Sequence, residues 1–222
     1  MEKYFLVTGG SGGIGREVCK CLTSIGYIPI VGFCGNDKTA NEIALECDGI
    51  ALELDLRDTS SIESSLEPLI LNRIDLKGVV LAASLPPTVL PFGKIQSEDI
   101  ADQLQVQVIG NQFLLKLLIK EFFSKDKNGV IIGVLSAAMG ENVRASMNCM
   151  GSYIVGKFGL LGLLSVISCE YNWLKVETIK PEFTETKMLD VFDERFVSRL
   201  RDGNLLNAPD VIARDICSLI DG

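Results

Sequence analysis

Short apolar runs alternate with amphipathic stretches along the whole chain. The runs with β character predict strands at Tyr4–Thr8, Ile28–Phe33, Ile50–Leu54, Gly78–Ala82, Gly129–Leu135 and Leu174–Ile179. Between and after them, helical periodicity predicts helices at Gly13–Ser24, Lys38–Glu46, Ser60–Asn72, Ser97–Phe123, Cys149–Tyr171, Lys187–Arg201 and Ala208–Ile220, with Ser97 as a candidate N-cap. Strict alternation of strand and helix predicts an α/β fold, a doubly wound parallel sheet of about six strands with helices on both faces.

The sequence YFLVTGGSGGIG, at residues 4–15, joins the first strand directly to the first helix. A strand, a glycine turn and a helix N-terminus together direct backbone N–H groups toward an anionic diphosphate. Gly9 allows the tight turn, Gly13 lets a phosphate approach the backbone, and Gly15 allows close packing of helix and strand. We therefore expect a dinucleotide-binding site at the carboxyl end of the first strand.

Composition narrows the class of partner. The chain has 222 residues, a formal charge of −8 and no Lys/Arg-rich run, so we expect one domain and neither a nucleic-acid nor an anionic-membrane partner. Its seven scattered cysteines show no paired metal-ligand spacing and are typical of reduced, apolar thiols. It has no histidine, which excludes Ser-His-Asp and Cys-His catalysis and most catalytic zinc sites. We expect a small-molecule partner and no metal.

Neither a membrane span nor an export signal is expected. The most apolar stretch, Phe158–Cys169, is too short to cross a bilayer and contains glycine and serine, so we interpret it as a buried helix. The N-terminus enters a strand within a few residues and has no basic segment followed by an apolar one. We expect a cytoplasmic protein.

Tyr153 and Lys157 lie four residues apart on a predicted helix, so both side chains face the same way. A free phenol titrates near pH 10, which is too high for acid–base work at neutral pH. A nearby ammonium favours the phenolate and lowers that pKa. Tyr153 could then pass a proton to or from a substrate oxygen, although most Tyr-x-x-x-Lys pairs taken alone are only an aromatic and a solvated lysine.

The motifs occur together in one family. The chain resembles the short-chain dehydrogenase/reductase family, of the classical type that includes 3-oxoacyl-acyl-carrier-protein reductases, over nearly its whole length. The shared motifs are TGGSGGIG at 8–15, DLRD at 55–58, Ser136 after the fifth strand, YIVGK at 153–157 and PEFTETKM at 181–188. The resemblance implies a Rossmann-type sheet in the order 3-2-1-4-5-6 and a single dinucleotide-binding domain over residues 1–222.

The resemblance also implies a reaction. Hydride would move between C4 of a nicotinamide and a substrate carbon while Tyr153 transfers the proton and Lys157 holds the nicotinamide ribose and depresses the phenol pKa. Ser136 would hydrogen-bond the substrate oxygen, and Thr186 would contact the carboxamide. The other cofactor contacts implied are Gly9, Ser11, Gly13, Ile14, Gly15, Asp55, Leu56, Ala82, Ala83, Pro181 and Thr184.

Two departures from the family pattern concern the proton relay. Leu81–Ser84 replaces Asn-Asn-Ala-Gly, which removes the side-chain amides that brace the loop after the fourth strand. Gln107 stands where the long helix carries the catalytic asparagine, whose backbone holds a water in the relay to lysine, so glutamine can suffice. Asn111, one turn on, is the weaker alternative.

Two further departures lie after the fifth and sixth strands. Counting back from Gly140 places Ala137 rather than Ser136 at the catalytic serine position, but the longer spacing to the tyrosine allows an insertion that restores Ser136, which we favour. Glu182 replaces a glycine and adds a carboxylate near the nicotinamide phosphates. That charge would weaken binding unless it points away.

Cofactor choice depends on the end of the second strand. An acidic residue there binds the ribose 2′-OH of NAD, whereas a basic one accommodates the 2′-phosphate of NADP. The chain has a small polar turn with Asn36 and Lys38 and no carboxylate at the strand end itself, which favours NADP(H) over NAD(H). Asp37 and Lys38 could equally cap the next helix only.

The substrate region is expected in segments that the motifs leave variable. Phe192, Phe196 and Leu200 give residues 183–207 an apolar character, consistent with a lid over an acyl or other hydrophobic group, although helix packing explains them equally well. Since the chain ends at Gly222, just after the last helix, we expect a homodimer at most, formed through the two long helices.

Two classes of function follow. The first is an NAD(P)(H)-dependent oxidoreductase that reduces a ketone or 3-oxoacyl group, including a carrier-bound one, with Tyr153 as proton donor. The second is a divergent family member with lost or altered chemistry: a dinucleotide-binding partner protein, or a lyase or epimerase in a biosynthetic pathway. The intact Tyr153 and Lys157 favour the first, and the departures at Leu81–Ser84, Gln107 and Glu182 favour the second.

Overall fold

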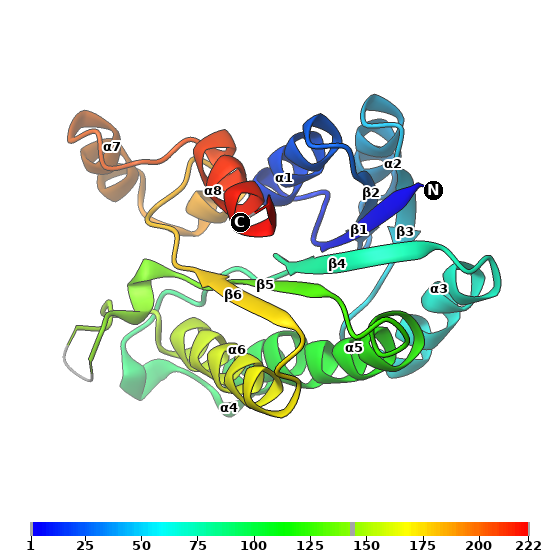
Figure 1. Ribbon diagram of the computed structural model, residues 1–222. Helices are drawn as coiled ribbons and strands as arrows, with labels where there is room; N and C mark the ends of the chain where they lie inside the picture. The colour runs from blue at the N-terminus through cyan, green and yellow to red at the C-terminus, as the bar shows by residue number, and fades with distance from the viewer. Residues whose placement is uncertain (1, 143–144, 222) are drawn as a thin grey trace.

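The computed structural model describes residues 2–142 and 145–221. Its centre is a sheet of six parallel strands in the order β3-β2-β1-β4-β5-β6, as the resemblance implied (Figure 1). The strands are β1 (Lys3–Thr8), β2 (Ile28–Phe33), β3 (Ile50–Glu53), β4 (Asp75–Leu81), β5 (Val130–Val134) and β6 (Lys175–Ile179). The reversal of strand order between β1 and β4 opens a crevice at their carboxyl ends, where ligands of this architecture bind.

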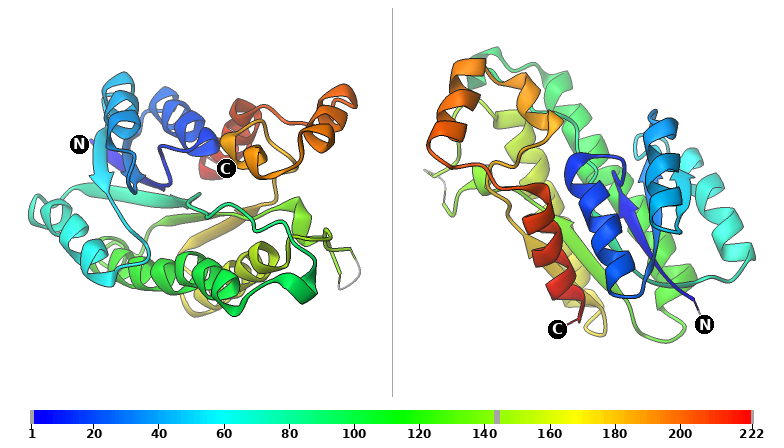
Figure 2. Two further views of the ribbon diagram at one scale, coloured as in Figure 1. Left: turned by 180° about the vertical axis from the view of Figure 1, so that it is seen from behind. Right: turned by 90° about the horizontal axis from the view of Figure 1, so that it is seen from above.

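Helices cover both faces of the sheet, as the views in Figures 1 and 2 show. One face is covered by α1 (Gly13–Ser24), α2 (Asp37–Glu46) and α8 (Pro209–Asp221). The other is covered by α3 (Thr59–Leu71), α4 (Ser97–Leu104), α5 (Asn111–Leu118) and α6 (Gly151–Glu170). The eighth α-helix of the described chain, α7 (Glu194–Asp202), lies beyond the sheet edge with the turn Lys187–Val191. The fold class is therefore the one that the alternating pattern predicts.

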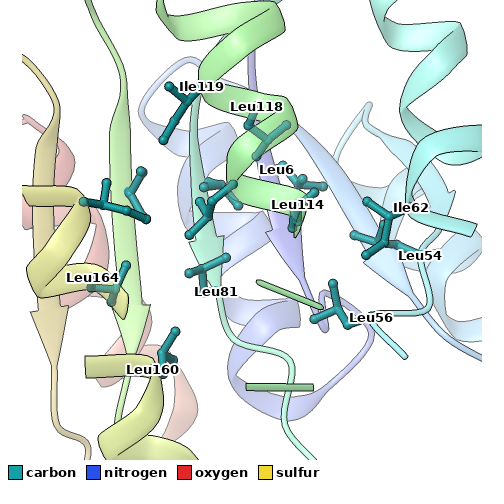
Figure 3. Close-up of a cluster of buried hydrophobic side chains, with 14 of the residues drawn as sticks. Leu6, Leu54, Leu56, Ile62, Leu81, Leu114, Leu118, Ile119, Leu160 and Leu164 are labelled. Carbon is teal, nitrogen blue, oxygen red and sulfur yellow. The ribbon is translucent and has the colours of Figure 1, made fainter. Parts of the chain in front are cut away.

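Alternation along the strands explains the two hydrophobic cores. In β1, Leu6 faces the α5 side and Val7 faces the α1 side, because successive side chains of a strand point to opposite faces. Figure 3 shows Leu6 together with Leu114 of α5 and Leu164 of α6, all fully or almost fully buried. Burying one such side chain contributes about 1.5–3 kcal/mol. These cores fix the strand ends from which the site is built.

Several element boundaries differ from the predicted ones. β4 begins at Asp75 instead of Gly78, because Lys3 and Tyr4 of β1 pair with the polar start of that strand. Ser97 is the first residue of α4 and not its N-cap: the backbone N–H of Gln96 donates to the Asp99 carboxylate at 2.9 Å.

The helical segments of the second half also differ in detail. The segment predicted at Lys187–Arg201 is two elements, because Asp193 caps α7 by accepting a hydrogen bond from the backbone N–H of Arg195 at 3.0 Å. The long helix from Ser97 to Phe123 is continuous but has π-helical geometry at Gln105–Gly110 and Ile119–Phe123. π-Helical turns often occur at functional sites.

Among the described residues, α6 is the one helix long and apolar enough to cross a membrane by length and composition. It is longer than the apolar stretch Phe158–Cys169 from which a span was excluded. The helix packs between the sheet and α4, and it carries the buried Lys157 and Tyr153. One face of α6 therefore belongs to the core.

Candidate functional site

The glycine turn lies at the crevice between β1 and β4. Gly9 has φ +65°, and a Cβ atom there would lie 2.8 Å from the Cα of Ala83. A Cβ atom on Gly13 would lie 2.5 Å from the methyl group of Thr186, so this glycine lets the later segment cross over the turn. Gly15 packs against the backbone of Gly9 and Gly10, within the turn itself. The tight turn expected at Gly9 is present, whereas the close contact at Gly15 is with the turn and not with the strand.

The N-terminus of α1 is open toward the crevice. Gly12 precedes the helix, no side chain caps it, and its first turn contains no acidic residue. An uncapped helix N-terminus carries partial positive charge and free N–H groups that suit a phosphate. Together with the space left by the missing Cβ atoms, this arrangement fits the diphosphate of a dinucleotide.

A cleft of about 1150 Å³ runs along the carboxyl ends of the strands. It is larger than the ~300–1,000 Å³ of a typical small-ligand pocket, so a dinucleotide and a second molecule can share it. The sequence-predicted residues that line it are Gly9, Ser11, Gly13, Ile14, Gly15, Asn36, Asp55, Leu56, Ala82, Ala83, Ser136, Tyr153, Pro181, Thr184 and Thr186. Lys38 is exposed on α2 and is not part of the lining, and Gln107 and Lys157 are buried behind it.

Lys157 is the central buried cation of this region. Its side chain is 1% exposed, and Nζ donates to the carbonyl of Val134 at 2.8 Å and to Oε1 of Gln107 at 3.4 Å. Nζ also lies 5.5 Å from the centre of the Tyr153 ring. Burial disfavours the charged form and lowers the pKa of Lys157 from 10.5 to about 7.

Tyr153 lies at the floor of the cleft, and its hydroxyl interacts with the hydroxyls of Ser136 and Ser84. The expected depression of the phenol pKa is not found. Burial raises the pKa of Tyr153 above 10.0, and the two serine hydrogen bonds only partly offset it. The reason is geometric: the Lys157 ammonium lies over the ring and is itself disfavoured by burial.

Ser136 and Ala137 have different surroundings. The Ser136 hydroxyl accepts a hydrogen bond from the backbone N–H of Ala138 at 3.2 Å and faces Tyr153. Ala137 begins a short helical turn, and its N–H donates to the carbonyl of Pro181 at 2.9 Å. Of the two residues weighed from the sequence, Ser136 is therefore the one whose side chain contacts the phenol.

Gln107 replaces the bracing that Leu81–Ser84 lacks. Its Nε2 donates to the carbonyl of Ala83 at 3.3 Å and to the hydroxyl of Ser84 at 2.8 Å. Asn111 does not face Lys157, because its amide donates to the backbone carbonyls of Val106 and Gln107 within the π-helical stretch. The loop after β4 is thus held by a side chain of the long helix.

Two residues of the site were missed by sequence reasoning. Ser84 was considered only as part of a lost amide segment, and its contact with Tyr153 depends on the fold. Arg57 was considered only as part of DLRD. Its guanidinium pairs with both carboxylate oxygens of Asp55, at 2.9 and 2.8 Å, and reaches the sulfur of Cys34 at the end of β2 at 3.5 Å.

This arrangement places an ion pair beside the end of β2. The guanidinium holds the pKa of the Asp55 carboxyl down, at about 2. Asp55, Arg57 and Cys34 all line the cleft, together with Asn36. The basic group beside the end of β2 is therefore Arg57 and not Lys38.

The cleft beside Tyr153 is apolar. Met150, Met188 and Phe192 pack with Tyr153 and line the cleft. Phe192 also meets Phe183, with ring centres 5.8 Å apart. Glu182 lines the same cleft and is exposed, with its backbone carbonyl accepting from the Thr184 hydroxyl at 2.9 Å.

The segment 183–207, which contributes Phe183 and Phe192 to the cleft, is held together at its two ends. Thr184 and Asn207 form a parallel bridge, in which the N–H of Asn207 donates to Phe183 at 2.8 Å and the N–H of Glu185 donates to Asn207 at 3.0 Å. The two ends of the segment 183–207 therefore lie side by side, joined by these hydrogen bonds.

Comparison with known proteins identifies the family. A model of the short chain dehydrogenase family matches residues 3–195. The chain therefore belongs to the short-chain dehydrogenase/reductase family of NAD(P)-dependent oxidoreductases. The short chain dehydrogenase/reductase astE of Aspergillus oryzae is 26% identical over 189 residues, which cover 81% of this chain and 70% of the relative. The 3-oxoacyl-acyl-carrier-protein reductase FabG of Escherichia coli is 27% identical over 192 residues, which cover 84% and 75%.

Solved structures show the same fold. A 3-ketoacyl-acyl-carrier-protein reductase from Brucella melitensis, in complex with NADH, has a TM-score of 0.85 at 21% identity and covers 98% of this chain and 90% of its own. A variant of the actinorhodin polyketide ketoreductase with NADPH has a TM-score of 0.85 at 19% identity, covering 99% and 90%. At these identities the likeness concerns the fold.

Proposed function

We propose that this chain reduces a ketone or 3-oxoacyl group to a secondary alcohol with NADP(H), and that Tyr153 donates the proton. The observation that carries the proposal is the phenol at the floor of the cleft, beside the Ser136 hydroxyl that lowers its pKa and with Lys157 over its ring face at 5.5 Å. The nicotinamide cofactor, when bound, supplies the hydride. The residues of this chain orient the carbonyl, exclude water and deliver a proton to its oxygen.

Ser136 and Tyr153 act on the same substrate oxygen. Because the Ser136 oxygen accepts from the backbone N–H of Ala138, its own hydrogen remains available for an acceptor in the cleft. A carbonyl oxygen that gains negative charge is stabilised by two hydroxyl donors held in place before the reaction. The Lys157 ammonium lies over the Tyr153 ring and is oriented by its hydrogen bond to the Val134 carbonyl.

The substrate is proposed to be uncharged and apolar around its carbonyl group. Met150, Met188 and Phe192 beside Tyr153 provide a flexible apolar surface without an ion-pairing group. Curated relatives include 3-oxoacyl-acyl-carrier-protein reductases, so a carrier-bound acyl group belongs to the same proposal. The lid at residues 183–207 would cover the acyl chain.

The cofactor preference is proposed to depend on Arg57. Its guanidinium lies beside Cys34 at the end of β2, in the region where family members bind the adenine ribose. A planar guanidinium suits the 2′-phosphate of NADP, and the Asp55 carboxylate holds it in place.

The oligomer is proposed to be a homodimer formed through α6 and the long helix. Val155, Phe158 and Val166 of α6 are 43%, 44% and 53% exposed, and Ile109 of the long helix is 49% exposed. Burying such side chains against a second copy is favourable because it removes apolar surface from water.

The proposal is tested with Tyr153→Phe and its matched control Tyr171→Phe, which changes a tyrosine at the opposite end of α6. Oxidation of NADPH is followed with acetoacetyl-CoA and with an uncharged aromatic ketone. We expect Tyr153→Phe to lower kcat about a hundredfold to ten-thousandfold, as loss of a general acid does, without changing NADPH binding measured by fluorescence. Full activity in Tyr153→Phe would refute the proton-donor role. Absence of NADPH and NADH binding in the unaltered protein would instead favour a divergent family member that has lost the oxidoreductase chemistry.

A further inference from the structure

Ser84 provides Tyr153 with a second hydroxyl partner that the family pattern does not contain. The resemblance aligns Ser84 with the glycine of Asn-Asn-Ala-Gly, which has no side chain. In this chain Ser84 and Ser136, from the loop after β4 and the loop after β5, line the same cleft as Tyr153, and the hydroxyls of both lower the pKa of the phenol.

The amide of Gln107 is fixed in one orientation by its neighbours. Lys157 Nζ can only donate hydrogen bonds, so it requires the oxygen of the amide, Oε1, at 3.4 Å. The Ala83 carbonyl can only accept, so it requires the nitrogen, Nε2, at 3.3 Å. Nε2 therefore donates to the Ser84 hydroxyl at 2.8 Å, which makes the Ser84 oxygen an acceptor.

The hydrogen of Ser84 is then left with two acceptors. One is the carbonyl of Leu85, at 3.2 Å from the Ser84 oxygen, and the other is the oxygen of Tyr153. A neutral phenol can itself donate to Ser84, but a phenolate is the stronger acceptor and draws the serine hydrogen to itself. Rotation of one hydroxyl group therefore follows the charge on Tyr153.

The backbone of Gln107 is engaged elsewhere. Its carbonyl accepts from the Asn111 side chain at 3.1 Å, within the π-helical stretch Gln105–Gly110. The contact with Lys157 is instead made by the Gln107 side chain. The two departures from the family pattern, at the loop after β4 and in the long helix, thus meet in one set of hydrogen bonds.

We propose that Ser84 is a catalytic hydroxyl that stabilises the Tyr153 phenolate, and that Gln107 is the positioning residue that directs Ser84 toward it and joins it to Lys157. The inference rests on the proposed role of Tyr153 as proton donor. It concerns only hydrogen bonds and requires no further reactant: as the proton passes from the phenol to the substrate oxygen, the serine hydrogen turns from Leu85 to the phenolate.

The first test observes the phenol without any substrate. The Cζ resonance of isotope-labelled Tyr153, assigned by its loss in Tyr153→Phe, is followed by NMR across pH in Ser84→Ala and Gln107→Leu. We expect the resonance to move at neutral pH and the Tyr153 pKa to rise by about one unit in Ser84→Ala, because a hydrogen bond to the charged form is lost. Gln107→Leu should raise the Tyr153 pKa in the same direction, because Ser84 is no longer held toward the phenol. Ser65→Ala, which removes a hydroxyl bonded to the backbone of Ser61, is the matched control and should leave both unchanged.

The second test uses turnover of acetoacetyl-CoA with NADPH. We expect Ser84→Ala to lower kcat about tenfold with little change in KM, and its kcat–pH profile to shift toward higher pH. An unmoved Tyr153 resonance together with an unchanged kcat would overturn the inference. The proposed function fails separately, by full activity in Tyr153→Phe, even when Ser84→Ala moves the Tyr153 resonance.

Discussion

The glycine turn and the Tyr153 cluster, formed by Ser84, Gln107, Ser136, Tyr153 and Lys157, lie on the same cleft but are built in opposite ways. The turn is continuous in sequence and presents backbone groups without ionisable side chains. The cluster joins two loops and two helices through side chains, among them Lys157 and Gln107, which are 50 residues apart and almost fully buried.

This difference determines which amino-acid substitutions each part can tolerate. A turn held by backbone geometry fails when any side chain is added, because the neighbouring backbone cannot move away. A cluster of side chains can exchange one hydrogen-bonding residue for another when the partners stay satisfied, as Gln107 and Ser84 do in place of the family amides. The turn is therefore rigid in sequence, and the cluster is where this chain departs from its family.

Gly9→Ala tests the rigid side of the comparison and has the largest expected loss of stability at neutral pH. The new Cβ atom meets the Ala83 backbone and must also adopt a φ of +65°, so we expect a loss of about 3 kcal/mol or more in the free energy of unfolding, measured by urea denaturation. Gly26→Ala is the control, because Gly26 has φ +87° with open space around its Cβ position. It should cost only the ~1–2 kcal/mol of the backbone strain. Equal losses of unfolding free energy in the two variants would show that the clash with the Ala83 backbone does not contribute to the destabilisation.

The same difference explains what the sequence could predict. The glycine turn and the Tyr153–Lys157 pair follow from local patterns, whereas the strand order was implied by the family resemblance, and all three are present. The start of β4 at Asp75 could not be predicted, because a polar stretch becomes a strand only by pairing with β1. The contact of Gln107 with Ser84, 23 residues away, depends on how the long helix packs against α6 and the loop after β4. The hydrophobic pattern of the sequence does not indicate it.

Lys157→Met tests the buried side of the comparison. A lysine whose folded pKa is lowered from 10.5 to about 7 destabilises the fold most below about pH 7, and this cost disappears as pH rises toward the unfolded value. We therefore expect the stability of the variant relative to the unaltered protein to be highest near pH 6 and to fall by up to about 5 kcal/mol toward alkaline pH. The lost hydrogen bonds to Val134 and Gln107 lower the variant by a similar amount at each pH.

The readout for this prediction is the slope with pH and not the sign at one pH. Urea unfolding of Lys157→Met is compared with Lys116→Met, which removes an exposed lysine of α5. A constant difference between Lys157→Met and the unaltered protein from about pH 6 to pH 9 would contradict a buried charge at Lys157.

Arg57→Ala gives the smallest effect and tests the open rim of the cleft. The Asp55–Arg57 pair is exposed, so its loss should cost at most about 1 kcal/mol of stability. The substitution should weaken the binding of NADPH about tenfold, because one charge-assisted contact to the 2′-phosphate is lost and the Asp55 carboxylate is left unpaired. The affinity for NADH should stay nearly unchanged. Lys38→Ala is the matched control and should alter neither affinity in fluorescence titrations, since Lys38 does not line the cleft. An equal loss of affinity for both cofactors in Arg57→Ala would contradict a 2′-phosphate contact at Arg57. A larger loss of NADPH affinity in Lys38→Ala would instead place that contact at the turn after β2.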